Sequence, residues 1–239
     1  MKQWMLLSLA CGSLLAPAAL KAAPAWSGTV ALASDNLLRG VSRSSNDPAA
    51  SGELRAQWAN GVFASLWTST SRVRPADDTT LEIAGTLGMA VPLRGNWAVR
   101  GSYTHYESPW QQRADFYRYD EFTLDLRYRD ALFLTASYSP NTSRYASGYG
   151  PAWDKDAFAY EASMQRELRT NLRAHAGVGY YDLSSLFGEG YWYGSIGLGW
   201  SWHRVQMDLS WVDTDDKAER LSYIGAAGSR VLLILGFNF

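Results

Sequence analysis

Charged side chains recur at alternate positions along this chain, and their types and spacing suggest a chemistry of ions. Six are acids and six are bases: Glu53, Glu82, Glu121, Asp125, Glu161 and Asp208, with Arg55, Arg100, Arg127, Arg129, Arg173 and Arg230. Because charges are costly in an apolar environment, these groups must line a wet interior or pair with each other. They can therefore give a narrow passage a weak ion preference, or form a ladder of salt bridges that closes it.

The three histidines are candidates for general-base catalysis. A lipid hydrolase needs a serine within hydrogen-bond reach of its base. His105 is followed by Tyr106 to Ser108, which spells out no such pair, and we interpret His105 as an interfacial neighbour of Tyr103. His175 is expected to face inward and His203 to lie in a turn. No catalytic residue is therefore assigned.

A cluster of carboxylates at 213–219 (DTDDKAE) is a third candidate site, because carboxylate oxygens can hold a divalent cation. The stretch lacks the glycine and the ligand spacing of a calcium-binding loop. We interpret it as a solvated loop, and the sequence predicts no metal and no cofactor.

The elements that carry the charges show a period of two residues. In ASGELRAQWANG the charged side chains share one face and the apolar ones the other, namely Ala50, Gly52, Leu54, Ala56 and Trp58. Asn60-Gly61 follows, a dipeptide typical of a two-residue β-hairpin turn. The alternation predicts twelve strands, which begin near Trp26, Ala50, Val62, Leu81, Trp97, Phe122, Leu132, Phe158, Leu172, Trp192, Val205 and Val231.

Connections between these strands alternate between short and long. The long ones are polar and span 37–49, 71–79, 108–118, 140–155 and 213–228, and only the segment at 183–189 is shorter than its place predicts. A transmembrane barrel has tight turns on one side and longer loops on the other, whereas a soluble sandwich has no reason to separate them. No run of 18 apolar residues follows the N-terminal segment. The sequence therefore predicts an all-β, transmembrane, antiparallel up-and-down β-barrel.

Aromatic residues support this fold, because Trp and Tyr prefer the two membrane interfaces. On the predicted outward face they form one group at each end of the strands: Trp26, Trp58, Trp97, Tyr128, Trp200 and Phe237, and Tyr103, Phe122, Tyr138, Phe158, Tyr160, Tyr180, Trp192 and Trp211. At ~3.3 Å per residue the groups lie roughly 20 Å apart, close to the ~25 Å apolar band of outer-membrane barrels.

The N-terminus has the pattern of a secretory signal peptide. Lys2 precedes an apolar stretch that ends at Leu15, and small residues follow. We assign residues 1–23 to the signal and 24–239 to a single barrel domain. The sole cysteine, Cys11, falls in the signal, so no disulfide is expected. Without the two lysines of this segment, 20 of the 22 basic residues remain against 23 acidic ones, which argues against a nucleic-acid partner.

The C-terminal segment SRVLLILGFNF puts five apolar side chains on one face: Val231, Leu233, Leu235, Phe237 and Phe239. We expect lipid to contact this face and the first strand to pair with the edge. The tail resembles the C-terminal pattern of bacterial outer-membrane barrels, in which the final Phe is part of the assembly signal. The resemblance implies the barrel-assembly machinery as a partner. Leu232 and Ile234 depart from the polar inner face that the pattern predicts.

The stretch SDNLLRGVSRSSNDPAASG resembles the N-terminal signature of the TorF family of porins. The matching residues are Arg39, Gly40, Ser42, Asp47, Pro48 and Gly52. Leu38 stands where the family usually has an aromatic residue, and Arg43 where it more often has Gln. The resemblance implies an outer-membrane barrel assigned to transport.

These observations together predict a channel in the bacterial outer membrane through which small solutes or ions diffuse passively. Its working residues are the inward-facing charges, and its surroundings are outer-membrane lipid and lipopolysaccharide. The loop arginines Arg39, Arg43, Arg113 and Arg118 could attract anions at the outer mouth or contact lipopolysaccharide phosphates. Two alternatives stay open: a non-conducting structural barrel, and a barrel enzyme that acts on lipid.

Overall fold

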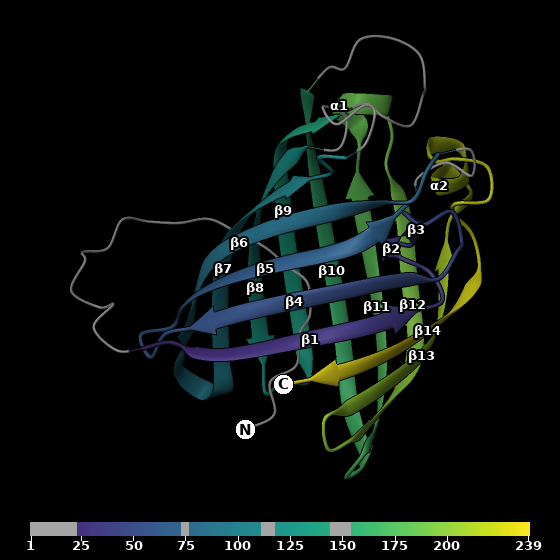
Figure 1. Ribbon diagram of the computed structural model, residues 1–239. Coiled ribbons are helices and arrows are strands. Elements are labelled where there is room, and N and C mark those ends of the chain that lie inside the picture. The colour runs from purple at the N-terminus through teal and green to yellow at the C-terminus, as the bar shows by residue number, and fades with distance from the viewer. Residues whose placement is uncertain (1–22, 73–76, 111–117, 144–153) are drawn as a thin grey trace.

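A computed structural model describes residues 23–72, 77–110, 118–143 and 154–239 of the protein. Within these residues, twelve strands close into one antiparallel barrel (Figure 1). The barrel strands are β1 (Ala25–Ala33), β4 (Ala49–Gln57), β5 (Val62–Ser71), β6 (Thr80–Pro92), β7 (Trp97–Glu107), β8 (Tyr119–Tyr128), β9 (Leu132–Ser143), β10 (Asp154–Arg169), β11 (Leu172–Asp182), β12 (Tyr191–Trp202), β13 (Val205–Thr214) and β14 (Arg230–Asn238). The predicted fold class and strand number are confirmed.

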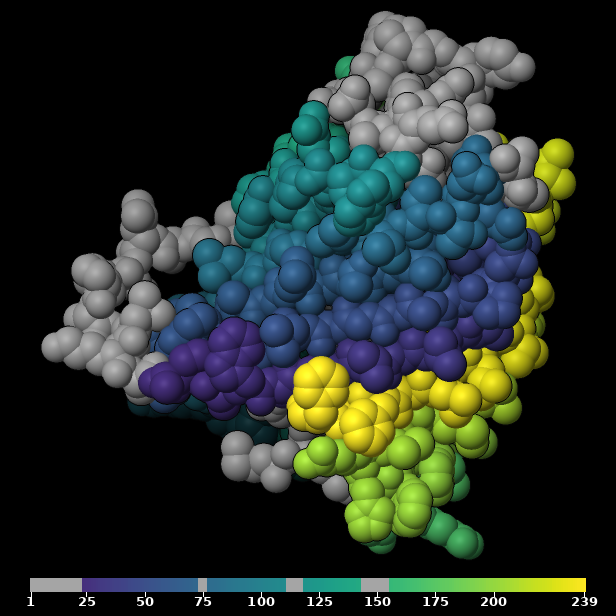
Figure 2. Space-filling model, viewed as in Figure 1, coloured from purple at the N-terminus to yellow at the C-terminus, as the bar shows by residue number. Residues whose placement is uncertain are grey.

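Neighbouring barrel strands in the chain are neighbours in the sheet, and β1 pairs with β14 to complete the ring. In Figure 2 the last strand, in yellow, lies along the first strand, in purple. Two further short strands, β2 (Leu37–Leu38) and β3 (Val41–Ser42), form a separate hairpin within the connection from β1 to β4. The sequence did not predict this hairpin.

Side chains alternate between the two faces of the wall, as the period of two predicts. The outward-facing Leu54 and Leu87 are 45% and 59% exposed, whereas the inward-facing Glu82, Ser102 and Thr104 are almost fully buried. Outward-facing residues are therefore mostly apolar and inward-facing residues mostly polar. Among the residues that the structure describes, no helix has the length and hydropathy of a membrane span.

The two ends of the barrel differ in their connections. One end, called here the short-turn end, carries the connections at 58–61, 93–96, 129–131, 170–171 and 203–204. The other, called here the long-loop end, carries those at 34–48, 72–79, 108–118, 144–153, 183–190 and 215–229. The predicted alternation of short and long connections is confirmed, although the described residues include only part of the connections at 72–79 and 108–118 and none of the one at 144–153.

The turn after β4 differs in detail from the predicted two-residue hairpin. Gly61 has a φ of 92° while Asn60 has an ordinary negative φ. The Gly61 amide donates to the Trp58 carbonyl at 3.0 Å, as in a type I turn followed by a left-handed residue. A two-residue type I′ turn needs positive φ at both central positions, and Asn60 does not have it. The strands are therefore joined by the longer turn, which has one residue more than predicted.

Closure of the barrel brings the chain's last residue onto its first strand. The Phe239 amide and carbonyl form two hydrogen bonds with the backbone of Gly28, at 3.0 and 2.9 Å. The Phe239 ring lies over Gly28 so closely that a Cβ at this position would be 2.4 Å from a ring carbon.

Leu232 and Ile234 face inward opposite Ser210 and Asp208, where they are half-buried.

A small apolar cluster lies at the long-loop end. Its buried members come from β10, β12 and two loops, which contain the helices α1 (Ser184–Phe187) and α2 (Asp216–Leu221). They are Ala157, Leu183, Leu186, Tyr191, Ala218 and Ala227. Val41 of β3 packs against this cluster, so the hairpin of the first long connection belongs to the same assembly.

Candidate functional site

The inner wall of the barrel carries eleven of the twelve charges that the alternation predicts to face inward. Each lies on the face opposite to the exposed apolar residues of its strand, as Glu53 and Arg55 do on either side of Leu54. The prediction was wrong for Arg129. This residue lies in the turn after β8 with a φ of 52°, and its guanidinium sits 5.2 Å from the centre of the Tyr128 ring.

The connection from β1 to β4, residues 34–48, folds into the barrel and is called here the first loop. At its tip Arg39 and Gly40 have positive φ values of 51° and 79°. A Cβ on Gly40 would lie 2.5 Å from Thr214 and 3.1 Å from Tyr193, which are inward-facing residues of β13 and β12. A glycine is needed here because the loop tip approaches the wall so closely. The first loop therefore crosses the lumen.

Two ion pairs hold the first loop to the inner wall. Arg39 contacts Glu121 of β8 at 2.7 Å, and Arg43 contacts Glu82 of β6 at 2.8 Å. The Glu82 and Glu121 side chains are 1% and 4% exposed, so water screens these charges weakly. A buried carboxylate needs a counter-charge, and in both cases the first loop supplies it.

The environment keeps both loop guanidiniums charged. Burial lowers the pKa of Arg39, but the Glu121 carboxylate, Tyr181, Tyr193 and Glu161 together raise it by more, and the resulting pKa lies well above that of a free arginine. Arg43 behaves in the same way: burial lowers its pKa, and the Glu82 carboxylate together with Tyr119 and Tyr106 raises it by more, so the net pKa lies above the ordinary value. The contacts are therefore those of permanent cations.

Tyrosines surround the two pairs. The Arg39 guanidinium lies 4.4 Å from the centre of the Tyr181 ring, a distance typical of a cation–π contact. Tyr106 and Tyr119 stack with their ring centres 4.4 Å apart beside the Arg43 pair, and the Arg43 guanidinium lies 3.4 Å from the Tyr119 hydroxyl. In this half of the barrel, side chains of the wall therefore pack against the first loop inside the lumen.

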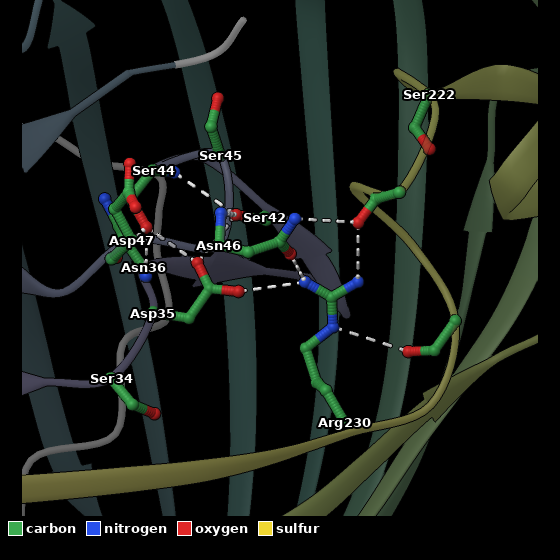
Figure 3. Close-up of polar contacts among 12 residues, drawn as sticks. Ser34, Asp35, Asn36, Ser42, Ser44, Ser45, Asn46, Asp47, Ser222 and Arg230 are labelled. Atoms are coloured by element: carbon green, nitrogen blue, oxygen red, sulfur yellow. Dashed lines mark hydrogen bonds and ion pairs between the residues drawn. The ribbon is translucent and has the colours of Figure 1, made fainter. Parts of the chain in front are cut away.

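Arg230 ties the first loop to the start of the last strand, as Figure 3 shows. Its Nη1 donates to Asp35 at 2.9 Å and to the side chain of Asn46. The Asp35 carboxylate also accepts hydrogen bonds from the hydroxyls of Ser42 and Ser44, at 2.6 and 2.7 Å. Arg230 therefore faces inward as predicted, but its partners belong to the first loop and, through the carbonyls of Gly225 and Gly228, to the connection at 215–229.

Charges in the short-turn half of the lumen form pairs between strands. Arg100 on β7 contacts Asp125 on β8 at 2.8 Å. On the other side, Asp208 on β13 contacts His175 at 2.9 Å and Arg173 at 3.6 Å, both on β11. These side chains are 14–23% exposed, against 1–15% for the pairs that hold the first loop. His175 faces inward, as predicted.

Arg55 makes a different contact. Its guanidinium lies 3.8 Å from the centre of the inward-facing Phe63 ring, and it donates to Gln57 at 3.0 Å. Phe63 in turn packs on Gly88, where a Cβ would be 2.5 Å from the ring. Arg127 is near the short-turn end and pairs with Asp130 at 3.1 Å in an exposed position.

Three loop predictions have specific outcomes. Arg39 and Arg43 were expected at the outer mouth, facing anions or lipopolysaccharide, but they lie inside the barrel in ion pairs. Arg113 lies outside the described residues. In the acidic stretch at 213–219, Asp215 caps α2 by accepting from the amides of Lys217 and Ala218. Among the described residues, no group of three or more His, Cys, Asp or Glu side chains is placed to hold a metal ion.

Sequence comparison gives the family. Residues 18–233 match the family described as "Bacterial protein of unknown function (Gcw_chp)". The chain belongs to the Gcw_chp family. The TorF name that the first-loop motif suggested is thus not supported, whereas the porin-like barrel that the resemblance implied is. No curated protein matches the chain in sequence.

Solved structures with a similar fold are outer-membrane porins and channels. The KdgM porin in complex with disordered oligogalacturonate has a TM-score of 0.58 and 7% identity, with 90% of this chain and 99% of that chain covered. The NanC porin has a TM-score of 0.57, 11% identity and coverages of 90% and 99%. The COG4313 outer membrane channel from Pseudomonas putida F1 has a TM-score of 0.50, 8% identity and coverages of 95% and 99%. At these identities the likeness shows the fold alone.

Proposed function

We propose that this member of the Gcw_chp family is an outer-membrane channel through which small solutes or ions diffuse passively. The observation that carries the proposal is the division of side chains across the closed barrel, with charges on the inner wall and apolar residues on the outer wall. In a lipid bilayer this division leaves the polar face available to water and solutes. The porin-like fold and the motif that resembles the TorF porins both support the proposal, and neither suggests an enzyme.

Membrane placement follows from the same fold. The long-loop end faces outward and the short-turn end faces the periplasm, in the usual arrangement of outer-membrane barrels. Residues 1–23 act as the signal for export, residues 24–239 form the barrel domain, and the strand that ends at Phe239 is recognised by the barrel-assembly machinery. Outer-membrane lipid and lipopolysaccharide then surround the exposed apolar wall.

Inside this barrel the first loop acts as the constriction. Arg39 and Arg43 bridge from the loop to β8 and β6, and with the tyrosines around them they occupy the long-loop half of the lumen. The pairs in the short-turn half are more exposed. Solutes therefore meet the main barrier at the first loop, and its ion pairs control the width of the path.

Planar-bilayer recording of the purified protein tests this proposal. The double variant Arg39→Ala/Arg43→Ala removes both ion pairs, and we expect its single-channel conductance to rise roughly twofold or more, because the loop loses its anchors in the lumen. The matched control is Arg129→Ala, which removes an arginine from an exposed turn outside the lumen and is expected to leave the conductance unchanged.

A non-conducting structural barrel is the second candidate, and the buried ion pairs of the first loop favour it. They fill the lumen in the way that the salt-bridge ladder of the sequence analysis would. The two candidates give different recordings. Conductance steps in the wild type support an open channel, and steps in the double variant alone support a channel that the first loop closes. If both proteins give only leak current, the channel proposal is wrong.

A further inference from the structure

A group of polar side chains lies on the outward face of the barrel, where apolar residues otherwise predominate. Tyr103, His105 and Glu107 alternate along the end of β7, Asp120 lies on β8, and Asn141 lies on β9. These five residues are called here the outer-wall cluster. Charged groups on the lipid-facing side of a barrel destabilise it most at mid-depth and little near the interface. Their presence points to a polar partner at this level.

Asp120 is the centre of the cluster and is fully engaged. Its carboxylate accepts hydrogen bonds from the Tyr103 hydroxyl, from His105 Nδ1 at 2.8 Å and from Asn141 Nδ2 at 2.8 Å. Its amide donates to Asn141 Oδ1 at 2.7 Å. Because an ionised carboxylate only accepts, Nδ1 of His105 carries a proton. In the neutral ring, Nε2 is then an acceptor with its lone pair directed away from Asp120.

The side of the cluster that faces outward presents the Glu107 carboxylate and, in the neutral ring, the Nε2 acceptor of His105. Nε2 of His105 lies 4.0 Å from the Glu107 carboxylate, and the two side chains are 40% and 43% exposed. Gly85 pairs with His105 in the sheet, and a Cβ added to Gly85 would meet no atom within 4 Å. The wall beside the imidazole is thus open on the β6 side. A ligand that fits here must bring hydrogen-bond donors.

An aromatic row fixes the depth of the cluster. Outward-facing rings follow one another across β7 to β10, with centres 5.4 Å apart for Tyr103 and Phe122, 6.4 Å for Phe122 and Tyr138, and 4.9 Å for Tyr138 and Phe158. His105 pairs with Asp120 two positions beyond the pair of Tyr103 and Phe122, toward the long-loop end. Because aromatic belts mark the border of the apolar layer, the cluster lies at the level of the lipid headgroups.

We propose that the outer-wall cluster binds the saccharide headgroup of an outer-leaflet glycolipid. Sugar hydroxyls donate to His105 Nε2 and to Glu107, and the adjacent aromatic row provides apolar ring faces against which a sugar can pack. The carboxylates of Glu107 and Asp120 beside His105 disfavour a bare phosphate as the recognised group, because charges of the same sign repel. The inference rests on the proposed outer-membrane orientation, and it does not depend on conduction.

Lipid binding by the purified detergent-solubilised protein tests the inference. Deep-rough lipopolysaccharide and phosphatidylglycerol are titrated separately, and bound lipid is counted by native mass spectrometry. The variant His105→Leu/Glu107→Leu removes both acceptors, and we expect it to bind lipopolysaccharide about tenfold more weakly with its phosphatidylglycerol binding unchanged, as for the loss of two hydrogen bonds. Asp213→Leu is the control. It removes an outward-facing carboxylate on β13, which accepts from Ser229 at 2.7 Å, and is expected to bind both lipids as the wild type does.

Two results would overturn the inference. The first is an unchanged lipopolysaccharide affinity in the double variant. The second is an equal loss of phosphatidylglycerol binding, which would mean that the cluster binds lipid without recognising a sugar. Compact, heat-modifiable migration on gels verifies that each variant is folded. Conductance separates this inference from the proposed function. If neither the wild type nor Arg39→Ala/Arg43→Ala conducts but the wild type binds lipopolysaccharide through the cluster, the inference stands and only the channel proposal fails. A conducting protein whose lipopolysaccharide affinity does not depend on the cluster gives the reverse result.

Discussion

Glu82 illustrates how a single residue of the inner wall holds the first loop in place. Its side chain is 1% exposed, and its carboxylate contacts Arg43 at 2.8 Å. An ion taken out of water needs a partner, and removing one member of a buried pair typically costs about 3–5 kcal/mol because the other charge is left uncompensated. The first loop is thus coupled to the wall by residues that lie 39 positions apart in the chain, Arg43 and Glu82.

Adding a methyl group at Gly61 tests how much the turn after β4 contributes to stability. Gly61 has a positive φ, and a Cβ there would lie 2.2 Å from the Ala90 carbonyl oxygen. We expect Gly61→Ala to lower the free energy of unfolding by roughly 2 kcal/mol or more, about 1 kcal/mol of it from the left-handed conformation and the rest from the clash. Urea unfolding in detergent micelles, followed by tryptophan fluorescence, measures the change.

Gly95→Ala is the control for that substitution. Gly95 also has a positive φ, of 69°, but a Cβ there would contact only Trp97 at 3.8 Å. It should therefore show the conformational part alone, about 1 kcal/mol. Equal losses of unfolding free energy in the two variants would mean that the close approach of Gly61 to Ala90 does not contribute to the effect.

The first loop is the element that makes contacts with several strands inside the lumen. Its hairpin of β2 and β3 packs into the lumen, its tip touches β12 and β13, and Arg230 ties it to β14. Each of these contacts joins the loop to a strand far from it in the chain. An element anchored in this way narrows the barrel without a separate domain.

The closing strand pair gives a prediction at the scale of elements. A side chain at Gly28 would collide with the Phe239 ring, at 2.4 Å for Cβ alone. We expect Gly28→Val to destabilise the barrel by about 1–3 kcal/mol, and the added change Phe239→Ala to relieve part of that loss. The temperature at which the compact form is lost on gels gives the measurement.

Gly52→Val serves as the reference for Gly28→Val. Gly52 also faces outward, on the strand beside β1, and a Cβ there would make ordinary contacts of 3.7 Å with Thr29 and 3.9 Å with Val30. Its effect on the temperature should be small. A loss as large as that of Gly28→Val would contradict the role given to the contact with Phe239.

Charge pairing is the property of the whole molecule that bears on function. Most inward-facing charges contact a charge of the opposite sign, as Arg100 does with Asp125 and Arg39 with Glu121. Opposite charges a few ångströms apart largely cancel each other's field at longer range. A solute in the lumen therefore meets local hydrogen-bonding groups more than a field of one sign.

This cancellation predicts weak ion selectivity. We expect the permeability ratio of K⁺ to Cl⁻ to lie within about threefold of unity. The reversal potential in a salt gradient across a planar bilayer measures the ratio. Strong selectivity of either sign, about tenfold or more, would show that unpaired charges control the pore.

Much of the fold could be predicted from the sequence because alternation records a local environment. Each strand has one side in an apolar medium and one side facing inward, so the residue types of a strand report its two faces without knowledge of its neighbours. This reasoning identified the twelve strands, the closing segment and the inward side of residues such as Glu53 and Asp208. It failed for Arg129, because the strand ends one residue earlier and a turn has no faces.

Only the tertiary structure decided what the inward charges contact and how the lumen is filled. The first loop has no period that predicts its direction, and its pairing of Arg39 with Glu121 joins residues 82 positions apart. The pair of His105 and Asp120 was missed for the same reason: the sequence places Ser108 near the histidine, whereas the register of β7 and β8 brings Asp120 there. A strand's faces are set by neighbouring residues in the chain, but ion pairs and loop positions are set by distances across the closed barrel.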